Sequence, residues 1–192
     1  MSFTSKLLAC VAAVGLSGLA LGAPMTIDTQ KSEIEWIGKK VSGEHNGTLM
    51  LESGKFDLDK GTGNFVIDMK SINNKDLDGE WKQKLEGHLK SDDFFNVEKY
   101  PQAKFVLKKA TKQKDGKYKM TGDLTVKGIT KPVEFDATME EKDKMKWLMA
   151  DFQIDRLKWD IKYNSGKFFD VKKLGDKMIY DDIGIKLKLA TK

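Results

Sequence analysis

Residues 117–139 read KYKMTGDLTVKGITKPVEFDATM, and apolar and polar side chains alternate along most of this stretch. The apolar side of its first half consists of Tyr118, Met120, Gly122, Leu124 and Val126. Its second half repeats the alternation with Val133, Phe135, Ala137 and Met139. A period of two residues is typical of a strand with one buried face and one solvated face. The stretch therefore predicts two antiparallel strands, with a turn that includes Lys131 and Pro132.

The same period recurs on both sides of this stretch. It is clear at the C-terminal end, over 183–189, and weaker over 33–38, 47–52, 55–58, 63–71, 102–110 and 147–154. Turn residues separate these segments at Ser53-Gly54, Lys60-Gly61 and Asp115-Gly116. Short strands at near-regular spacing predict an all-β sandwich or a closed antiparallel barrel of about eight strands.

One helix interrupts the strands. In DGEWKQKLEGHLKSDDFF, residues 78–95, Trp81, Leu85 and Leu89 recur every four residues and form one apolar stripe. We expect this short helix to cover an opening or one flank of the sheet. The adjacent Phe94 and Phe95 are then expected to turn inward and cover one end of the barrel.

The first 22 residues have the composition of a secretory signal peptide. One basic residue, Lys6, precedes an apolar run over 7–21, and small residues follow it. That run is shorter than the roughly 20 residues that a membrane span needs, so a membrane anchor is disfavoured. Cleavage before Ala23 would leave residues 23–192 as one domain outside the cytoplasm, periplasmic or secreted. It would also remove Cys10, the only cysteine, and with it any disulfide or thiol nucleophile.

The charge pattern argues against a nucleic-acid partner. The chain carries a formal net charge of +5, and Arg156 is its only arginine. Lysines alternate with acidic residues along the predicted strands, which is typical of a solvated sheet face. Nucleic-acid readers instead gather arginine and lysine on one face.

No motif for catalysis, metal binding or a cofactor is present. His45 and His88 are the only histidines, and neither stands in an HExxH spacing. The HLKSDD run at 88–93 contains serine, histidine and acids, but catalytic triads are assembled from distant segments. We therefore expect no catalytic residues, no metal site and no cofactor.

The apolar strand faces offer two interpretations. An eight-stranded barrel either fills its interior with side chains or holds one small ligand. If a ligand cavity exists, we expect it to be lined by Trp36, Phe65, Ile67, Phe95, Phe105, Leu107, Leu124, Val126, Phe135, Trp147 and Met149, with Arg156 at its polar end. Methionines such as Met69, Met120 and Met139 suit an adaptable interior.

Three segments resemble one known family. SDDFFNVEKYPQAKF at 91–105, MTGDLTVKGITKPVEFDATM at 120–139 and IDTQKSEIEWIGKK at 27–40 are similar to the signatures of the YceI-like family of secreted lipid-binding proteins. The resemblance implies a lipocalin-like antiparallel barrel with an elongated apolar cavity. It further implies a long-chain isoprenoid or another amphiphilic lipid as the ligand, export to the periplasm or beyond, no catalytic residues and no stable membrane insertion. It permits a homodimer.

Two functions from other classes stay open. A solidly packed barrel would suit an interaction module that binds a protein through the long loop over 156–182, because loops on a rigid scaffold often carry function. An enzyme acting on a quinone-like or lipid substrate is the weakest alternative, because the sequence supplies few histidines and no nucleophile.

Arg156 also has two interpretations. Its guanidinium is a planar donor in a chain that otherwise uses lysine, and Trp159 and Tyr163 follow it closely. A structural contact would hold the loop against the barrel mouth, whereas a functional contact would bind the polar head of a lipid.

The N-terminal pattern generates a first prediction. Protein exported from a bacterial host should lack residues 1–22, because the short apolar run and the small residues after it match a cleavable signal. Intact-mass measurement of the exported protein checks this. A mass that includes Met1 to Gly22 would refute it.

Overall fold

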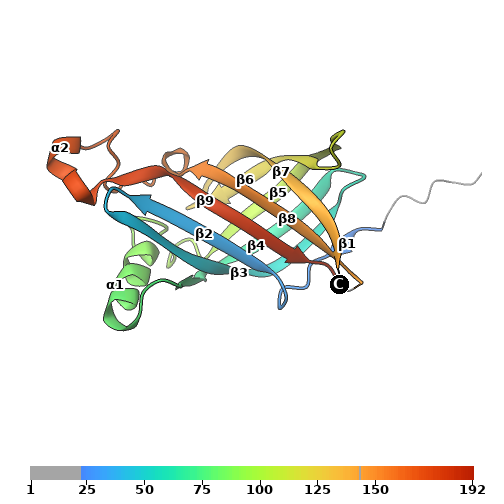
Figure 1. Ribbon diagram of the computed structural model, residues 1–192, viewed down its shortest axis with the longest axis horizontal. Helices are drawn as coiled ribbons and strands as arrows, with labels where there is room; N and C mark the ends of the chain where they lie inside the picture. The colour runs from blue at the N-terminus through green and yellow to red at the C-terminus, as the bar shows by residue number, and fades with distance from the viewer. Residues whose placement is uncertain (1–22, 143) are drawn as a thin grey trace, which may run out of the picture.

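The computed structural model describes residues 23–142 and 144–192. The predicted signal peptide, residues 1–22, lies outside this range. The described chain forms an elongated antiparallel barrel with two short helices at one end (Figure 1). Its strands are β1 (Met25–Thr26), β2 (Glu33–Lys40), β3 (Gly43–Asp57), β4 (Thr62–Asn74), β5 (Gln102–Lys112), β6 (Tyr118–Val126), β7 (Ile129–Lys142), β8 (Met145–Asp155) and β9 (Ile179–Ala190).

Eight long strands close the barrel, as the sequence predicts. Their order is β3-β2-β9-β8-β7-β6-β5-β4, every neighbour is antiparallel, and β4 pairs back onto β3. The two-residue β1 adds to β3 near one rim. Closure pairs both edges of the sheet with each other, so the long strands present no free edge for association.

Two predicted turns are wrong. Ser53 and Gly54 lie inside β3, where the β3–β4 register shifts between Leu51 and Ser53. A bulge of this kind bends a long strand without ending it, and a bulge carries the same kinds of residue as a turn. The turn after β6 falls at Lys127-Gly128, where both residues have positive φ, of 50° and 74°. Pro132 instead lies within β7, opposite Asp123.

One end of the barrel is closed by side chains. Ile27, Phe56 and Leu107 are 1–2% exposed there, next to the β3–β4 turn and β1. Gly54 allows the close approach of Ile27, because a Cβ at Gly54 would lie 2.7 Å from the Ile27 side chain. We call this the closed end.

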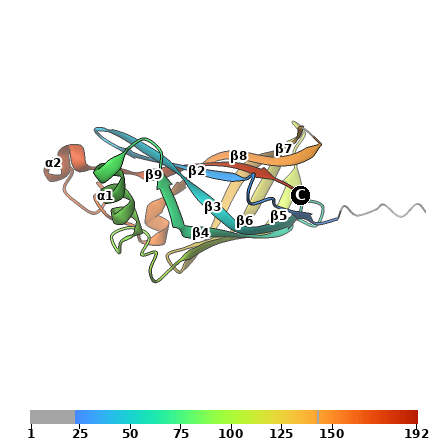
Figure 2. The same ribbon diagram turned by 90° about the horizontal axis from the view of Figure 1, so that it is seen from below.

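The opposite end, which we call the mouth, carries the two helices of the described residues (Figures 1 and 2). Helix α1 (Gly79–Lys90) lies in the β4–β5 connection. The β8–β9 connection holds the 3₁₀ turn η1 (Arg156–Trp159), helix α2 (Val171–Leu174) and the 3₁₀ turn η2 (Gly175–Lys177). The prediction of one helix therefore missed α2, because four residues are too few to show a helical period. No helix in the described part of the chain is long and apolar enough to cross a membrane.

The predicted apolar stripe of α1 only partly faces the barrel. Leu89 packs against the core, whereas Trp81 is 70% exposed. Residues four apart advance about 40° beyond one full helical turn, so the stripe rotates by about 80° between Trp81 and Leu89. Only the C-terminal end of the helix therefore meets the mouth.

Strand β5 generates a second prediction, because its neighbouring residues face opposite sides. Phe105→Asp should lower the free energy of unfolding by about 3 kcal/mol or more, because it removes a packed ring and buries a charge. Lys104→Asp, on the exposed side of the same strand, should change it by less than about 0.5 kcal/mol. Urea unfolding of both variants checks this. Equal losses would contradict the observed register.

Candidate binding cavity

An apolar cavity of about 200 Å³ lies inside the barrel, between the closed end and the mouth. Every strand from β2 to β9 contributes to it, and Arg156 is the one charged residue among its described lining residues. The predicted residues that line it are Trp36, Phe65, Ile67, Phe95, Phe105, Leu124, Val126, Phe135 and Arg156. The interior is therefore not completely filled, which favours the cavity interpretation over the solidly packed core.

A row of phenylalanine rings forms part of the cavity wall. The ring centroids of Phe65 and Phe105 lie 5.9 Å apart, those of Phe105 and Phe135 5.6 Å, and those of Phe135 and Phe152 4.2 Å. The row crosses β6 at Gly122, where a Cβ would lie 2.6 Å from the Phe105 ring. Gly122 thus provides the space for Phe105, and such ring pairs add about 0.5–1.5 kcal/mol each beyond area burial.

Two residues that the sequence predicts to line the cavity, both on β8, face outward instead. Trp147 lies under the ammonium group of Lys188, 5.3 Å from the ring centroid, and Met149 pairs with Lys188 on the outer surface. The inward residues are instead Leu148, Phe152 and Ile154, which line the cavity. The prediction of Trp147 and Met149 as lining residues is therefore wrong by one strand position.

The sequence does contain a signal that selects the correct register. The run from Trp147 to Ala150 is apolar at every position, so its period is ambiguous. Asp151 and Gln153 follow it, are exposed, and lie on the same side of β8 as Trp147 and Met149. Counting back from these polar residues places Leu148 inside.

Leu107 is buried but does not line the cavity. It pairs with Gly63, whereas Phe105 pairs with Phe65, so Leu107 lies one strand period nearer the closed end. There it packs in the core beyond the phenylalanine row. Its prediction as a lining residue is wrong, because alternation gives the face of a strand but not the depth along it.

Aromatic residues partly cover the mouth, as the sequence predicts for Phe94 and Phe95. Both line the cavity, and Phe94 is 8% exposed. Phe94 contacts His88 and Tyr163, with centroid distances of 5.0 Å and 5.4 Å. The other side of the mouth is covered by Trp159, which is 1% exposed and donates a hydrogen bond from Nε1 to the Leu124 carbonyl at 3.1 Å.

The two histidines have carboxylate partners. His88 Nε2 lies 3.0 Å from Asp93 Oδ2, and His45 Nδ1 lies 2.7 Å from Asp76 Oδ2. The backbone N–H of Asn46 also donates to Asp76, at 2.8 Å. Burial by itself would raise the pKa of Asp76. The hydrogen bonds together have the larger effect, so this pKa is lowered. The His45–Asp76 pair joins the β4–β5 connection to β3, whereas the His88–Asp93 pair lies within that connection. In the described ranges, no three His, Asp or Glu side chains gather as a metal site.

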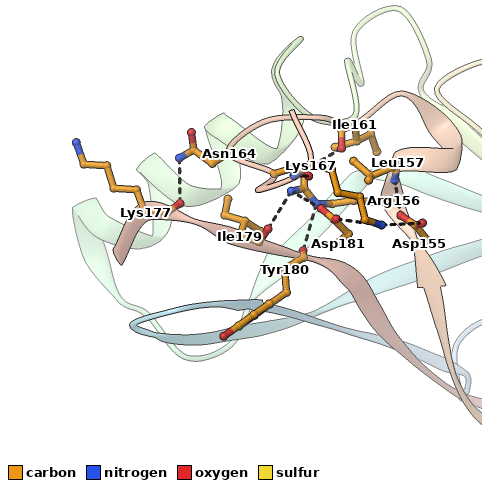
Figure 3. A network of polar contacts seen from close by, with 11 residues as sticks. Asp155, Arg156, Leu157, Ile161, Asn164, Lys167, Lys177, Ile179, Tyr180 and Asp181 are labelled. Carbon is orange, nitrogen blue, oxygen red and sulfur yellow. Dashed lines mark hydrogen bonds and ion pairs between the residues drawn. The ribbon is translucent and has the colours of Figure 1, made fainter. Parts of the chain in front are cut away.

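Arg156 lies at the centre of a polar network at the mouth (Figure 3). Its side chain is 1% exposed, and it donates hydrogen bonds to the carbonyls of Ile161 at 2.8 Å, Ile179 at 3.2 Å and Tyr180 at 3.2 Å. A fourth bond, of 3.3 Å, reaches Asp181 Oδ1. The guanidinium thus binds both ends of the β8–β9 connection, and Lys167 adds a 3.4 Å ion pair to Asp181.

Burial sets the electrostatics of this network. Desolvation lowers the pKa of the Arg156 guanidinium, while the charges of Asp181 and Asp155 act in the opposite direction. The planar fork reaches acceptors in several fixed directions from three nitrogen atoms, whereas a lysine carries its three donors on a single nitrogen atom. Among the described residues, each aromatic ring that stacks with a cation does so with a lysine. These contacts favour the structural interpretation of Arg156.

Comparison with known proteins gives a consistent match. The model of the YceI-like domain family matches residues 25–191. A UPF0312 protein of Pseudomonas putida is 32% identical over 139 residues, covering 68% of this chain and 69% of that protein. A UPF0312 protein of Photorhabdus laumondii is 48% identical over 60 residues, which is 31% of each chain.

Two solved structures share the fold. BcnA of Burkholderia cenocepacia superposes with a TM-score of 0.68 at 23% identity, covering 86% of this chain and 99% of that one. A domain from Saccharophagus degradans, described as a polyisoprenoid binding domain, superposes with a TM-score of 0.65 at 12% identity. It covers 88% of this chain and 97% of its own.

The Arg156 network generates a third prediction. Arg156→Lys should lower the free energy of unfolding by about 2–4 kcal/mol, because the ammonium group leaves buried carbonyls unpaired. If the cavity binds a lipid, as the sequence predicts, its affinity should stay unchanged in the fraction that remains folded. Lys158→Gln, on the exposed side of the same turn, is the matched control. Loss of affinity without loss of stability would instead assign Arg156 to the lipid headgroup.

Proposed function

The chain belongs to the YceI-like domain family, and from this premise we propose that it is a non-catalytic binding protein for a long-chain isoprenoid or a similar amphiphilic lipid. The apolar cavity is the observation that carries the proposal. Its described lining residues are apolar except for Arg156, whose guanidinium already binds protein acceptors. Such a cavity favours a hydrocarbon chain, because each buried CH₂ group contributes about 0.8 kcal/mol.

The domain from Saccharophagus degradans supports this choice of ligand. That domain is described as polyisoprenoid binding, and its fold superposes over most of both chains. An isoprenoid is a branched, unsaturated hydrocarbon without hydrogen-bonding groups along its length. It therefore suits a wall of aliphatic and aromatic side chains.

The size of the cavity sets a condition on loading. Ligand sites usually measure about 300–1,000 Å³, so a cavity of about 200 Å³ must widen to accept a long chain. Met69 and Met120 line it, and methionine is unbranched and adapts readily to new packing. The phenylalanine row is a second movable wall. We infer that loading shifts these side chains along the barrel axis and leaves the strand ladder in place.

The chemistry of the lining supports a non-catalytic role. Among the described lining residues, none is a histidine, serine, aspartate or glutamate. General acid–base and nucleophilic catalysis most often use these groups, and Tyr180 supplies the one hydroxyl among the described lining residues. We further propose, from the N-terminal pattern alone, that the protein works outside the cytoplasm.

Mass spectrometry of an organic extract from the purified protein tests the proposal and is the fourth prediction. The extract should contain a long-chain lipid in near-stoichiometric amount, or empty protein should take up an added isoprenoid. Protein that is repeatedly empty and binds no added isoprenoid would overturn the proposal.

A matched pair of variants assigns the lipid to the cavity. Ala103→Phe places a ring in the cavity wall, whereas Lys104→Phe places the same ring on the outer surface. Excluding about two CH₂ groups of ligand should weaken binding about ten-fold in the first variant only. Similar binding by both variants would place the lipid elsewhere.

A further inference from the structure

Five large apolar side chains are exposed together at the outer tip of the mouth. We call this set the tip patch: Val41, Phe168, Phe169, Val171 and Tyr180, which are 46–53% exposed. Single exposed apolar residues are common on protein surfaces and need no explanation. A group of them around one opening is a feature of interaction sites.

Hydrogen bonds join the β2–β3 turn to the β8–β9 connection, which carries Phe168, Phe169 and Val171. Val41, in the β2–β3 turn, donates its N–H to the Met178 carbonyl at 3.1 Å, and Ser42 donates to the Asp176 carbonyl at 3.3 Å. The N–H groups of Phe168 and Phe169 both donate to the Ser165 carbonyl, at 3.1 Å and 3.0 Å. The tip patch therefore rests on an ordered turn.

The helix α2 projects beyond the ends of the strands, on the same end as the β2–β3 turn (Figure 1). The Val171 side chain lies close to Gly166, where a Cβ would be 3.1 Å away. Tyr180, at the start of β9, is both exposed and part of the cavity lining. The tip patch thus borders the mouth of the cavity.

Exposed lysines accompany the tip patch. Lys172, Lys173 and Lys177 lie on and after α2, and all three are exposed. The ammonium group of Lys162 stacks over the Phe168 ring at 5.0 Å. The residues from 162 to 177 include five lysines and two aspartates. Lys162 pairs with Asp160 and Lys167 with Asp181, so the positive charge beside the tip patch comes mainly from Lys172, Lys173 and Lys177. One of the two aspartates in the segment, Asp170, accepts the Lys172 N–H at the start of α2.

We propose that the tip patch docks onto the surface of an anionic lipid bilayer. Aromatic rings partition to the boundary between headgroups and acyl chains, and lysines near the surface are attracted by anionic lipids. A protein partner fits this composition less well, because lysine is depleted from protein interfaces and arginine is enriched. The charged residues that accompany the tip patch in the segment from 162 to 177 are lysines and aspartates, with no arginine.

Docking would bring the mouth of the cavity to the bilayer. A hydrocarbon ligand could then pass between bilayer and barrel without crossing open water. This consequence rests on the proposed lipid-binding function, whereas docking itself does not. The two ideas can therefore fail separately.

Sedimentation with vesicles tests the docking and is the fifth prediction. The protein should sediment with vesicles of phosphatidylcholine and phosphatidylglycerol in equal parts, and much less with phosphatidylcholine alone. Binding should fall sharply between about 0.1 M and about 1 M salt, because the Debye length shrinks from about 10 Å to about 3 Å. Phe168→Ser combined with Phe169→Ser should weaken partitioning about ten-fold or more. Lys172→Gln combined with Lys173→Gln should weaken it roughly thirty-fold.

Matched controls lie elsewhere on the barrel. Met50→Ser removes an equally exposed apolar side chain, 57% exposed, from the barrel wall. Lys114→Gln combined with Lys142→Gln removes two exposed lysines from the closed end. Both controls should bind vesicles like the unchanged protein, and thermal melting verifies that every variant is folded.

Two outcomes would overturn the docking proposal. One is the absence of binding to anionic vesicles at low salt. The other is a homodimer in analytical ultracentrifugation that dissociates in the Phe168/Phe169 variant, because the tip patch would then bind a second copy. Isoprenoid uptake from detergent solution by the same variant reports separately on the cavity. Uptake without docking would leave the proposed function intact.

Discussion

The pairing of β4 with β3 is the constraint on which the rest of the structure depends. This pairing joins the two outermost long strands of the sheet, so every long strand has a neighbour on both sides. Closure divides the side chains of each strand into an inner and an outer set. Because backbone hydrogen bonds satisfy the strand polar groups, the inner set can be almost wholly apolar. The cavity is the part of that interior which the inner side chains do not fill.

The two ends of the barrel differ in how they are closed. At the closed end, Ile27, Phe56 and Leu107 pack in the core and are almost completely buried. At the mouth, two long connections meet and bring polar groups with them. Arg156 satisfies three carbonyls and one carboxylate there, and hydrogen bonds to a charged group contribute about 1.5–3 kcal/mol each. The mouth is therefore held by specific hydrogen bonds, whereas the closed end is held by the packing of apolar side chains.

This difference fits a protein that exchanges a hydrocarbon through one end. Opening the closed end would expose its buried apolar side chains to water and lose the free energy of their burial. A mouth built from connections can move while the strand ladder stays intact. The side chains that cover the mouth, such as Phe94 and Trp159, belong to these connections and not to the barrel wall. Phe168, Phe169 and Val171 of the tip patch lie in the β8–β9 connection as well, so a contact there acts directly on the segment that carries Trp159.

The sequence by itself determined most of the strands, because alternation of apolar and polar residues is a local property of each strand. The resemblance of three segments to the YceI-like family then selected the barrel over a sandwich. The sequence also indicated most of the cavity wall, including the inward side of Phe65, Phe105 and Phe135. Around Trp147, where four successive residues are apolar, alternation within the run is ambiguous, and only the polar residues Asp151 and Gln153 that follow it indicate the register. The distinction between a turn and a bulge at Ser53-Gly54 needed the partner strand.

Only the tertiary structure decided depth, volume and polar partners. Leu107 and Phe105 lie on the same face of β5, yet Leu107 packs at the closed end and Phe105 lines the cavity. Arg156 acquires acceptors that lie up to 25 residues away in the chain, and no spacing rule in the sequence indicates them. The tip patch joins a hairpin turn to a loop more than 120 residues later. Such features depend on contacts between distant segments, which exist only after the barrel has closed.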